Sequence, residues 1–185
     1  DLLLARNVGV PVVSVASIVQ RPLNSVMTLK KSGITRPAQL VGRKVGYPGI
    51  PTNEPLLQTM LQYDGGHTLK DVDLVNVGFN LGSALIGERV DACVGCYWTH
   101  ESIAMENQGY PVNVMKMEDW GVPNYYELIL VTNEDMLERD HAIVQNFVYA
   151  FRKGYMEALE DPQASIDILV SAFPEVDQEI DRPGI

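Results

Sequence analysis

Aromatic residues and carboxylates gather in three short segments of the chain. These segments, 47–54, 97–101 and 123–127, hold Tyr47, Glu54, Tyr97, Trp98, Glu101, Tyr125, Tyr126 and Glu127. Aromatic faces stack on flat rings, and each such contact contributes about 0.5–1.5 kcal/mol beyond area burial. A carboxylate that accepts charge-assisted hydrogen bonds from a ring nitrogen or an amino group adds about 1.5–3 kcal/mol. This combination favours a flat, nitrogen-rich ligand that is neutral or cationic.

Each of these residues also has a purely structural interpretation. A Tyr-Pro-Gly turn such as 47–49 is common in proteins, and a tryptophan after a buried strand, like Trp98, often only closes the core. Glu54 suits the first turn of a helix, where the helix dipole favours a negative charge. Glu127, at the start of a strand, can simply face solvent. Composition alone does not choose between the two interpretations.

Common catalytic motifs are missing from the chain. There is no G-x-S-x-G, no phosphate loop with Gly-Lys-Ser/Thr, no H-E-x-x-H and no G-x-G-x-x-G. Cys93 and Cys96 form one C-x-x-C, but the 3 histidines are scattered and give no complete zinc ligand set. Because residues 90–95 read as a buried strand, we expect both thiols to be core residues rather than a redox pair. We therefore predict a protein without catalytic residues, metal or cofactor.

The composition fits a globular protein that avoids anionic partners. The 185 residues are 46% hydrophobic, and 14 Lys and Arg against 24 Asp and Glu give a net charge of −10. Such a charge repels nucleic acid and anionic membrane surfaces. No apolar stretch approaches the roughly 20 residues that cross a bilayer. No segment resembles a signal peptide, and we expect the chain to begin at an internal position, with any signal outside it.

Strands and helices are expected to alternate along the chain. Residues 10–19, 72–77 and 90–95 are apolar and β-branched, as in strands buried on both faces, and 43–47 is a shorter strand. Helical spacing follows at 54–63 and 81–88. This order is typical of a parallel sheet wrapped by helices. Ligands bind beyond the carboxyl ends of such strands, where the segments 47–54 and 97–101 are expected.

Four ordered stretches of the chain form recognisable motifs: Q-R-P-L-N-S at 20–25, V-G-Y-P-G-I-P-T-N-E at 45–54, V-D-A-C-V-G-C-Y-W-T-H-E at 90–101 and G-V-P-N-Y-Y-E-L at 121–128. Together they resemble the NMT1/THI5-like family, and most closely its substrate-binding proteins of ABC importers for thiamine-precursor pyrimidines. The resemblance implies an α/β, type II periplasmic-binding fold, in which two lobes with mostly parallel sheets close on a ligand.

The resemblance also implies a division into lobes. Residues 1–36 and 124–185 are expected to form part of a first lobe, and residues 37–123 a second lobe. The first lobe is expected to be incomplete, because family members have further elements on both sides of the aligned region. An incomplete lobe predicts a homo-oligomer or a domain swap through its open sheet.

A set of ligand-binding residues follows from matching family positions. Tyr47 and either Tyr126 or Trp98 are expected to stack on the ring of the ligand, and Glu127 to accept a hydrogen bond from its amino group. The loop from Pro48 to Glu54 is expected to hold its polar substituent. The complete set is Tyr47, Pro48, Gly49, Asn53, Glu54, Trp98, Asn124, Tyr126 and Glu127. The implied partners are a small heterocycle and an ABC permease, and the implied location is extracytoplasmic, either periplasmic or lipid-anchored.

An enzyme is the alternative. Eukaryotic members of the family are pyridoxal-phosphate-dependent hydroxymethylpyrimidine phosphate synthases. That branch carries a cysteine-rich motif where this chain reads N-Y-Y-E at 124–127, and the departure counts against the synthase. Riboflavin, thiamine or a sulfonate-like ligand, and a domain repurposed for regulation or assembly, also stay open at this point.

Overall fold

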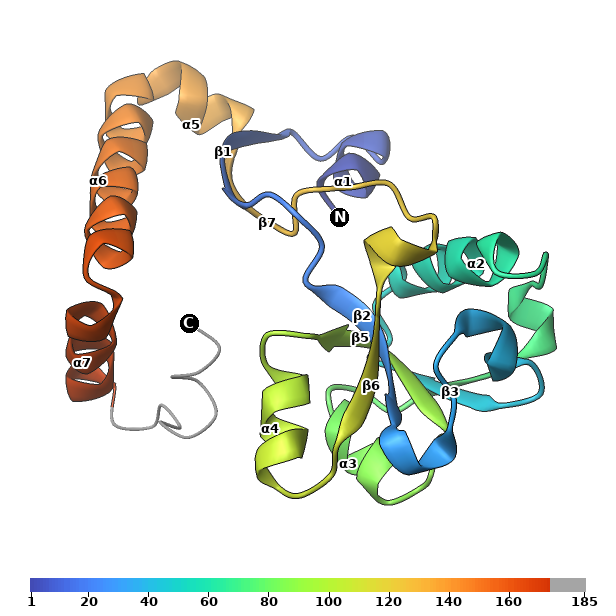
Figure 1. Ribbon diagram of the computed structural model, residues 1–185. Coiled ribbons are helices and arrows are strands. Elements are labelled where there is room, and N and C mark those ends of the chain that lie inside the picture. Colours follow the sequence, from blue (N-terminus) through green and yellow to red (C-terminus); the bar gives the residue numbers. More distant parts are fainter. Residues whose placement is uncertain (174–185) are drawn as a thin grey trace. The chain divides into compact units, whose positions relative to one another are not determined.

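The computed structural model describes residues 1–173, which form two compact units (Figure 1). Unit 1 comprises Asp1–Gln20 and 126–173, and unit 2 is Arg21–Tyr125. The sequence led us to expect residues 21–36 with the first lobe. The structure places them in unit 2, because the strand that they carry pairs there on both sides. Which unit corresponds to which lobe of a whole protein stays a prediction, and residues 174–185 lie outside the described part.

Unit 2 is built on a five-stranded sheet in the order β4-β3-β5-β2-β6. Its strands are β2 (Asn24–Leu29), β3 (Lys44–Tyr47), β4 (Asp73–Asn76), β5 (Ala92–Tyr97) and β6 (Val112–Lys116). β3 pairs in parallel with β4 and β5, whereas β2 is antiparallel to β5 and β6. The sheet is therefore mixed: β3, β4, β5 and β6 run in one direction, as a mostly parallel sheet requires, and β2 runs in the opposite direction.

Side chains pack on both faces of this sheet. One face carries α2 (Asn53–Tyr63), and its core includes Val26, Val45, Leu57 and Val94. The other face carries α3 (Leu81–Ile86) and α4 (Glu101–Asn107), with a core that includes Met27, Leu85, Cys93, Cys96 and Met105. The alternation Val26/Met27 follows the period of two that a strand buried on both faces requires. Each such buried side chain contributes about 1.5–3 kcal/mol.

Unit 1 is thinner. Its sheet pairs β1 (Val12–Val19) with β7 (Leu128–Asn133) in antiparallel orientation, and its helices are α1 (Leu2–Asn7), α5 (Glu134–Arg139), α6 (His141–Glu160) and α7 (Pro162–Ala172). β1 was expected to be buried on both faces, but its residues are mostly half-buried, because only β7 pairs with it within the described chain. Asn133 caps α5 as its residue type predicts, accepting a hydrogen bond from the Met136 N–H at 2.6 Å.

Within residues 1–173 no helix is both long enough and apolar enough to span a membrane.

Candidate functional site

Several of the predicted residues lie at one edge of the unit 2 sheet. Because β2 is antiparallel to β5 and β6, the carboxyl ends of β3, β4, β5 and β6 share an edge with the amino end of β2. Tyr47 ends β3, and Trp98 follows β5. Both are half-buried and pack against the two cores, Tyr47 on the α2 side and Trp98 on the α3 side. Their structural interpretation therefore holds in part, while each ring keeps some exposed surface.

The loop after β3 is fixed from the side of β4. Gly49 has a φ of +83°, which favours glycine, and a Cβ placed there would lie 2.7 Å from Nδ2 of Asn76. Asn76, at the end of β4, is itself held because its Oδ1 accepts a hydrogen bond from the Gly78 N–H at 3.0 Å. Gly49 is thus a position of close approach, and Asn76 is a site neighbour that the sequence analysis missed.

The same loop is fixed from β5 by a bulge at Gly95. This residue has a φ of +99°, and a Cβ there would lie 2.8 Å from Cδ of Pro48 and 3.1 Å from Nδ2 of Asn53. The Gly95 N–H donates to Oδ1 of Asn24, at 3.1 Å, across to the start of β2. The structure therefore brings Pro48 and Asn53 together against β5.

Asn53 is the most unusual polar side chain of this edge. It is the first residue of α2 and is only 2% exposed, yet its Oδ1 has no hydrogen-bond partner among the described residues. Leaving a buried acceptor unpaired costs about 1–3 kcal/mol. An unpaired buried acceptor beside a loop is what a site for a hydrogen-bond donor requires.

The start of α2 disfavours anions. Glu54 places a half-buried carboxylate in its first turn, and Pro55 has no N–H to donate. The Asn53 N–H is already bonded to the Ile50 carbonyl at 3.1 Å. Few donors are left for an oxyanion, so this helix end suits an amine-bearing ligand better than a phosphate or a sulfonate.

Trp98 is held on several sides. Its indole Nε1–H donates to the Pro22 carbonyl at 3.1 Å, its backbone N–H donates to the Leu23 carbonyl at 3.0 Å, and Nζ of Lys116 lies 3.9 Å from the ring centroid. A cation at this distance over the ring is attracted by the ring quadrupole. One ring face is therefore occupied, and a ligand that stacks on Trp98 must use the other. Lys116, at the end of β6, is a second neighbour that the sequence analysis missed.

The other predicted residues lie away from the loop after β3. Glu101 has a structural role, since its Oε2 accepts a hydrogen bond from the Tyr97 N–H at 2.7 Å. Asn124 is exposed on the segment that leaves unit 2. Tyr126 and Glu127 belong to unit 1, where Tyr126 is 59% exposed and the Glu127 N–H donates to the Val19 carbonyl at 2.9 Å.

Tyr126 and Glu127 line a hollow within unit 1. This hollow has a volume of about 380 Å³ and lies between α1 and β7, with Leu2, Ala5 and Ile129 among its other lining residues. Its lining combines apolar side chains with two acidic residues, Asp1 and Glu127, a combination that suits an apolar ligand with a hydrogen-bond donor.

The two cysteines are buried as expected, and they are also bonded. Cys93 and Cys96 are fully buried in the α3-side core, and the structure joins them in a disulfide. No cluster of His, Cys, Asp and Glu within residues 1–173 has the arrangement that would hold a metal ion.

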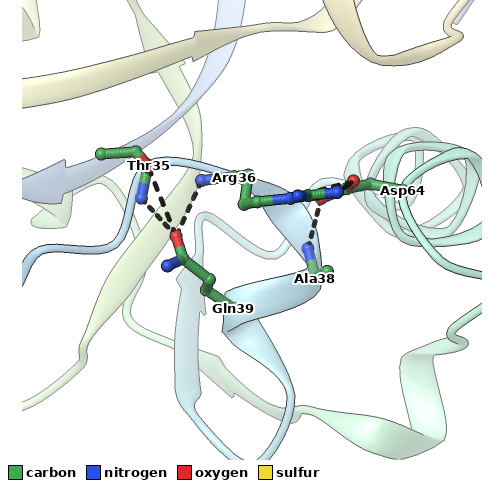
Figure 2. A network of polar contacts seen from close by, with 5 residues as sticks. All are labelled: Thr35, Arg36, Ala38, Gln39 and Asp64. Atoms are coloured by element: carbon green, nitrogen blue, oxygen red, sulfur yellow. Dashed lines mark hydrogen bonds and ion pairs between the residues drawn. The ribbon is translucent and has the colours of Figure 1, made fainter.

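A polar network at the far end of α2 supports the loop indirectly (Figure 2). Arg36 Nε donates to both carboxylate oxygens of Asp64, at 3.0 and 3.1 Å, and the Ala38 N–H donates to Oδ2 of Asp64 at 2.7 Å. The hydrogen bond from Arg36 is the largest of the effects that lower the pKa of the Asp64 carboxyl, and the same contact raises the pKa of Arg36. Gln39 completes the network by accepting from the Thr35 N–H at 2.8 Å.

Comparison with solved structures defines the class of fold. The periplasmic aliphatic sulphonate binding protein SsuA from Escherichia coli superposes with a TM-score of 0.76 at 19% identity, over 97% of this chain and 60% of that chain. The chain thus has the α/β fold of periplasmic binding proteins. A family model described as NMT1/THI5 like matches residues 1–165, and the chain belongs to this family.

The relatives of this chain include both a binding protein and a synthase. The formylaminopyrimidine-binding protein of Halalkalibacterium halodurans is 40% identical over 189 residues, which cover 100% of this chain and 57% of the relative. The 4-amino-5-hydroxymethyl-2-methylpyrimidine phosphate synthase THI11 of Saccharomyces cerevisiae is 27% identical over 188 residues, 96% of this chain and 55% of the relative. The chain therefore spans little more than half the length of these relatives.

Proposed function

We propose that this chain belongs to the solute-binding component of an ABC importer and that it binds a thiamine-precursor aminopyrimidine. The relative at 40% identity is a formylaminopyrimidine-binding protein by name, and this identity supports a carrier rather than an enzyme. The partners that follow are a small heterocycle and an ABC permease. The location that follows is extracytoplasmic, and a lipid anchor is one way to hold the protein there.

One observation carries the proposed site: Oδ1 of Asn53, at the start of α2 and directly after the loop that follows β3, is buried and has no partner among the described residues. An amino group on a pyrimidine supplies the donor that this oxygen lacks, while Tyr47 and the free face of Trp98 supply stacking surfaces. Pro48 and Gly49 shape the loop, and Glu54 adds negative potential. These features favour a neutral or cationic heterocycle.

Residues 124–127 contribute the rest of the proposed binding set. The resemblance of N-Y-Y-E to the family motif supports Asn124, Tyr126 and Glu127 as ligand-binding residues. Within unit 1, Tyr126 and Glu127 line a hollow, so both side chains border open space. Glu127 accepts from an amino or ring N–H group in this proposal, and Tyr126 stacks on the ring.

We further propose that this chain associates with a second copy of itself through unit 1. Its sheet has two strands, and large apolar side chains are exposed on its helices, among them Leu3, Ile143, Phe147 and Ile168. Apolar surface of this kind favours burial against further protein. A second copy, through oligomerisation or a domain swap, is the arrangement that we propose for this chain.

The pyridoxal-phosphate-dependent synthase is the second candidate, favoured by the 27% identical yeast relative. The lower identity and the absence of cysteines from residues 124–127 favour the carrier instead. A synthase would show the absorbance band of bound pyridoxal phosphate and would form the pyrimidine product. A carrier would show neither.

Asn53→Ala tests the proposed site. Calorimetric titration of formylaminopyrimidine should give a dissociation constant about 5–10-fold higher for this variant, because one buried hydrogen bond of about 1 kcal/mol is lost. Asn146→Ala, on the exposed surface of α6, is the matched control and should bind like the unchanged protein. Equal affinity in all three proteins would remove Asn53 from the site.

A further inference from the structure

The spacing of Cys93 and Cys96 conflicts with the side on which their sulfurs lie. Residues three apart in a regular strand point to opposite faces of the sheet. Both cysteines nevertheless belong to the same buried cluster as Leu85 and Met105, on the α3 side of the sheet. One extra residue must therefore lie between them in β5.

The extra residue is Gly95. β5 pairs with β2 through Val26↔Val94 and Ser25↔Cys96, so Gly95 has no counterpart and forms a bulge. Its φ of +99° favours glycine, and its N–H is turned to Oδ1 of Asn24 rather than to a ladder carbonyl. The bulge is what puts both sulfurs on one face, and the disulfide bridges it.

The bulge also carries the loop of the candidate site. At the position of a Gly95 Cβ, the nearest atoms are Cδ of Pro48 at 2.8 Å, and then Cγ of Pro48 and Nδ2 of Asn53 at 3.1 Å. No side chain fits there, so loop and bulge are in direct contact. A change in the bulge must move Pro48 and Asn53.

We propose that the Cys93–Cys96 disulfide is a positioning bond: it locks the Gly95 bulge and thereby holds the 48–54 loop in place. In the reduced form the S–S bond is broken and each sulfur carries a proton, with the two electrons supplied by a dithiol that itself becomes a disulfide. Cys93 and Cys96 are then free to separate, and β5 is free to lose its bulge. The loop loses its support as a consequence.

An oxidising compartment keeps such a bond closed, and a reducing one opens it. Because both sulfurs are fully buried, reduction requires local opening of the sheet, and the bond resists reductant in the folded protein. The geometry of the 48–54 loop depends on this bond whichever ligand the loop binds.

Thiol counting tests whether the bond exists. Protein secreted into an oxidising compartment, then denatured without reductant and alkylated, should show no labelled cysteine by mass spectrometry. The same protein denatured with reductant should show both cysteines labelled. Two labelled cysteines in the unreduced sample would overturn the proposal.

Hydrogen exchange tests the coupling without any ligand. The backbone amides of Asn53 and Leu56, which bond to Ile50 and Thr52, should exchange at least about tenfold faster in a Cys93→Ala/Cys96→Ala double variant. Val112→Ala is the matched control, since it removes volume from the same core at the other end of β2. In the Val112→Ala variant, the amides of Asn53 and Leu56 should exchange at the same rate as in the unchanged protein.

Reduced unchanged protein gives the second measurement, in case the double variant does not fold. After refolding in a thiol-free phosphine reductant, it should show the same faster exchange at Asn53 and Leu56. Loop exchange equal to that of the oxidised protein would overturn the coupling. A failure to bind formylaminopyrimidine would instead count only against the proposed function, because this readout uses no ligand.

Discussion

Lys116 and Trp98 form the best defined side-chain pair at the candidate site. The ammonium lies 3.9 Å from the ring centroid, and Trp98 is further anchored through its indole N–H to Pro22. The pair joins the ends of β5 and β6, two strands that are separated by β2 in the sheet. It therefore sets which face of the indole ring stays open to a ligand.

Replacing Lys116 by methionine isolates the charge, because the apolar stem is kept. We expect Lys116→Met to lower the free energy of unfolding by about 0.5–1 kcal/mol, the usual size of a partly exposed cation–π contact. Urea denaturation followed by tryptophan fluorescence measures it. Lys30→Met, at an exposed position, should be neutral. A Lys116→Met variant as stable as the unchanged protein would show that the contact contributes nothing.

Residue types point to part of the candidate site and give no sign of the rest, for a physical reason. Tyr47, Pro48 and Gly49 can be proposed from the sequence because a strand followed by an aromatic and turn residues is a local pattern. Asn76 and Lys116 lack such a signal, since they join the site only through the strand order β4-β3-β5-β2-β6. Strand order depends on contacts between distant parts of the chain, which local patterns do not encode.

At the scale of elements, the network around Asp64 fixes α2 to η2 (Pro37–Leu40). Asp64 is buried, and it accepts from the Arg36 side chain and from the Ala38 N–H. Since α2 begins at Asn53, this network at its other end stabilises the helix that carries the candidate loop. Figure 2 shows the five residues involved.

Asp64→Asn should make stability less dependent on pH. Because folding lowers the pKa of Asp64, its ionised form contributes stability above the unfolded pKa of about 3.9, and the contribution is lost as the pH falls through the lower folded pKa. At pH 7 we expect the variant to be about 1–3 kcal/mol less stable, a range that allows for the exposure of Arg36.

Thermal unfolding between pH 7 and pH 2.5 measures this effect. The difference between Asp64→Asn and the unchanged protein should narrow below about pH 4. Asp135→Asn, in an exposed ion pair, serves as the control and should change little at any pH. A stability difference for Asp64→Asn that stays constant down to pH 2.5 would contradict the assignment.

Most elements of unit 2 were predictable from hydrophobic period and turn residues, including β3, β4, β5 and α2. The direction of β2 was not, because an apolar strand has the same composition whichever way it runs. The Gly95 bulge was hidden for a similar reason: V-G-C reads as a continuous buried strand until the pairing with β2 is known. The expected α/β fold is confirmed: β3, β4, β5 and β6 of this sheet run in one direction, and β2 is the exception.

At the scale of the whole molecule, the net charge and the start of α2 point to the same class of ligand. The net charge of −10 disfavours polyanions, and Glu54 and Pro55 leave few donors for an oxyanion at the start of α2. SsuA, which shares the fold, is an aliphatic sulphonate binding protein. The proposed ligand of this chain is instead an amine-bearing ring, so related folds are expected to differ here in the charge that they accept.

Calorimetric titration of the intact protein with formylaminopyrimidine, riboflavin and an alkanesulfonate tests this central claim most directly. We predict a dissociation constant below about 100 μM for formylaminopyrimidine, with weaker binding of riboflavin and no measurable binding of the sulfonate. Tighter binding of the sulfonate than of the pyrimidine, or no binding of the pyrimidine at all, would contradict the account.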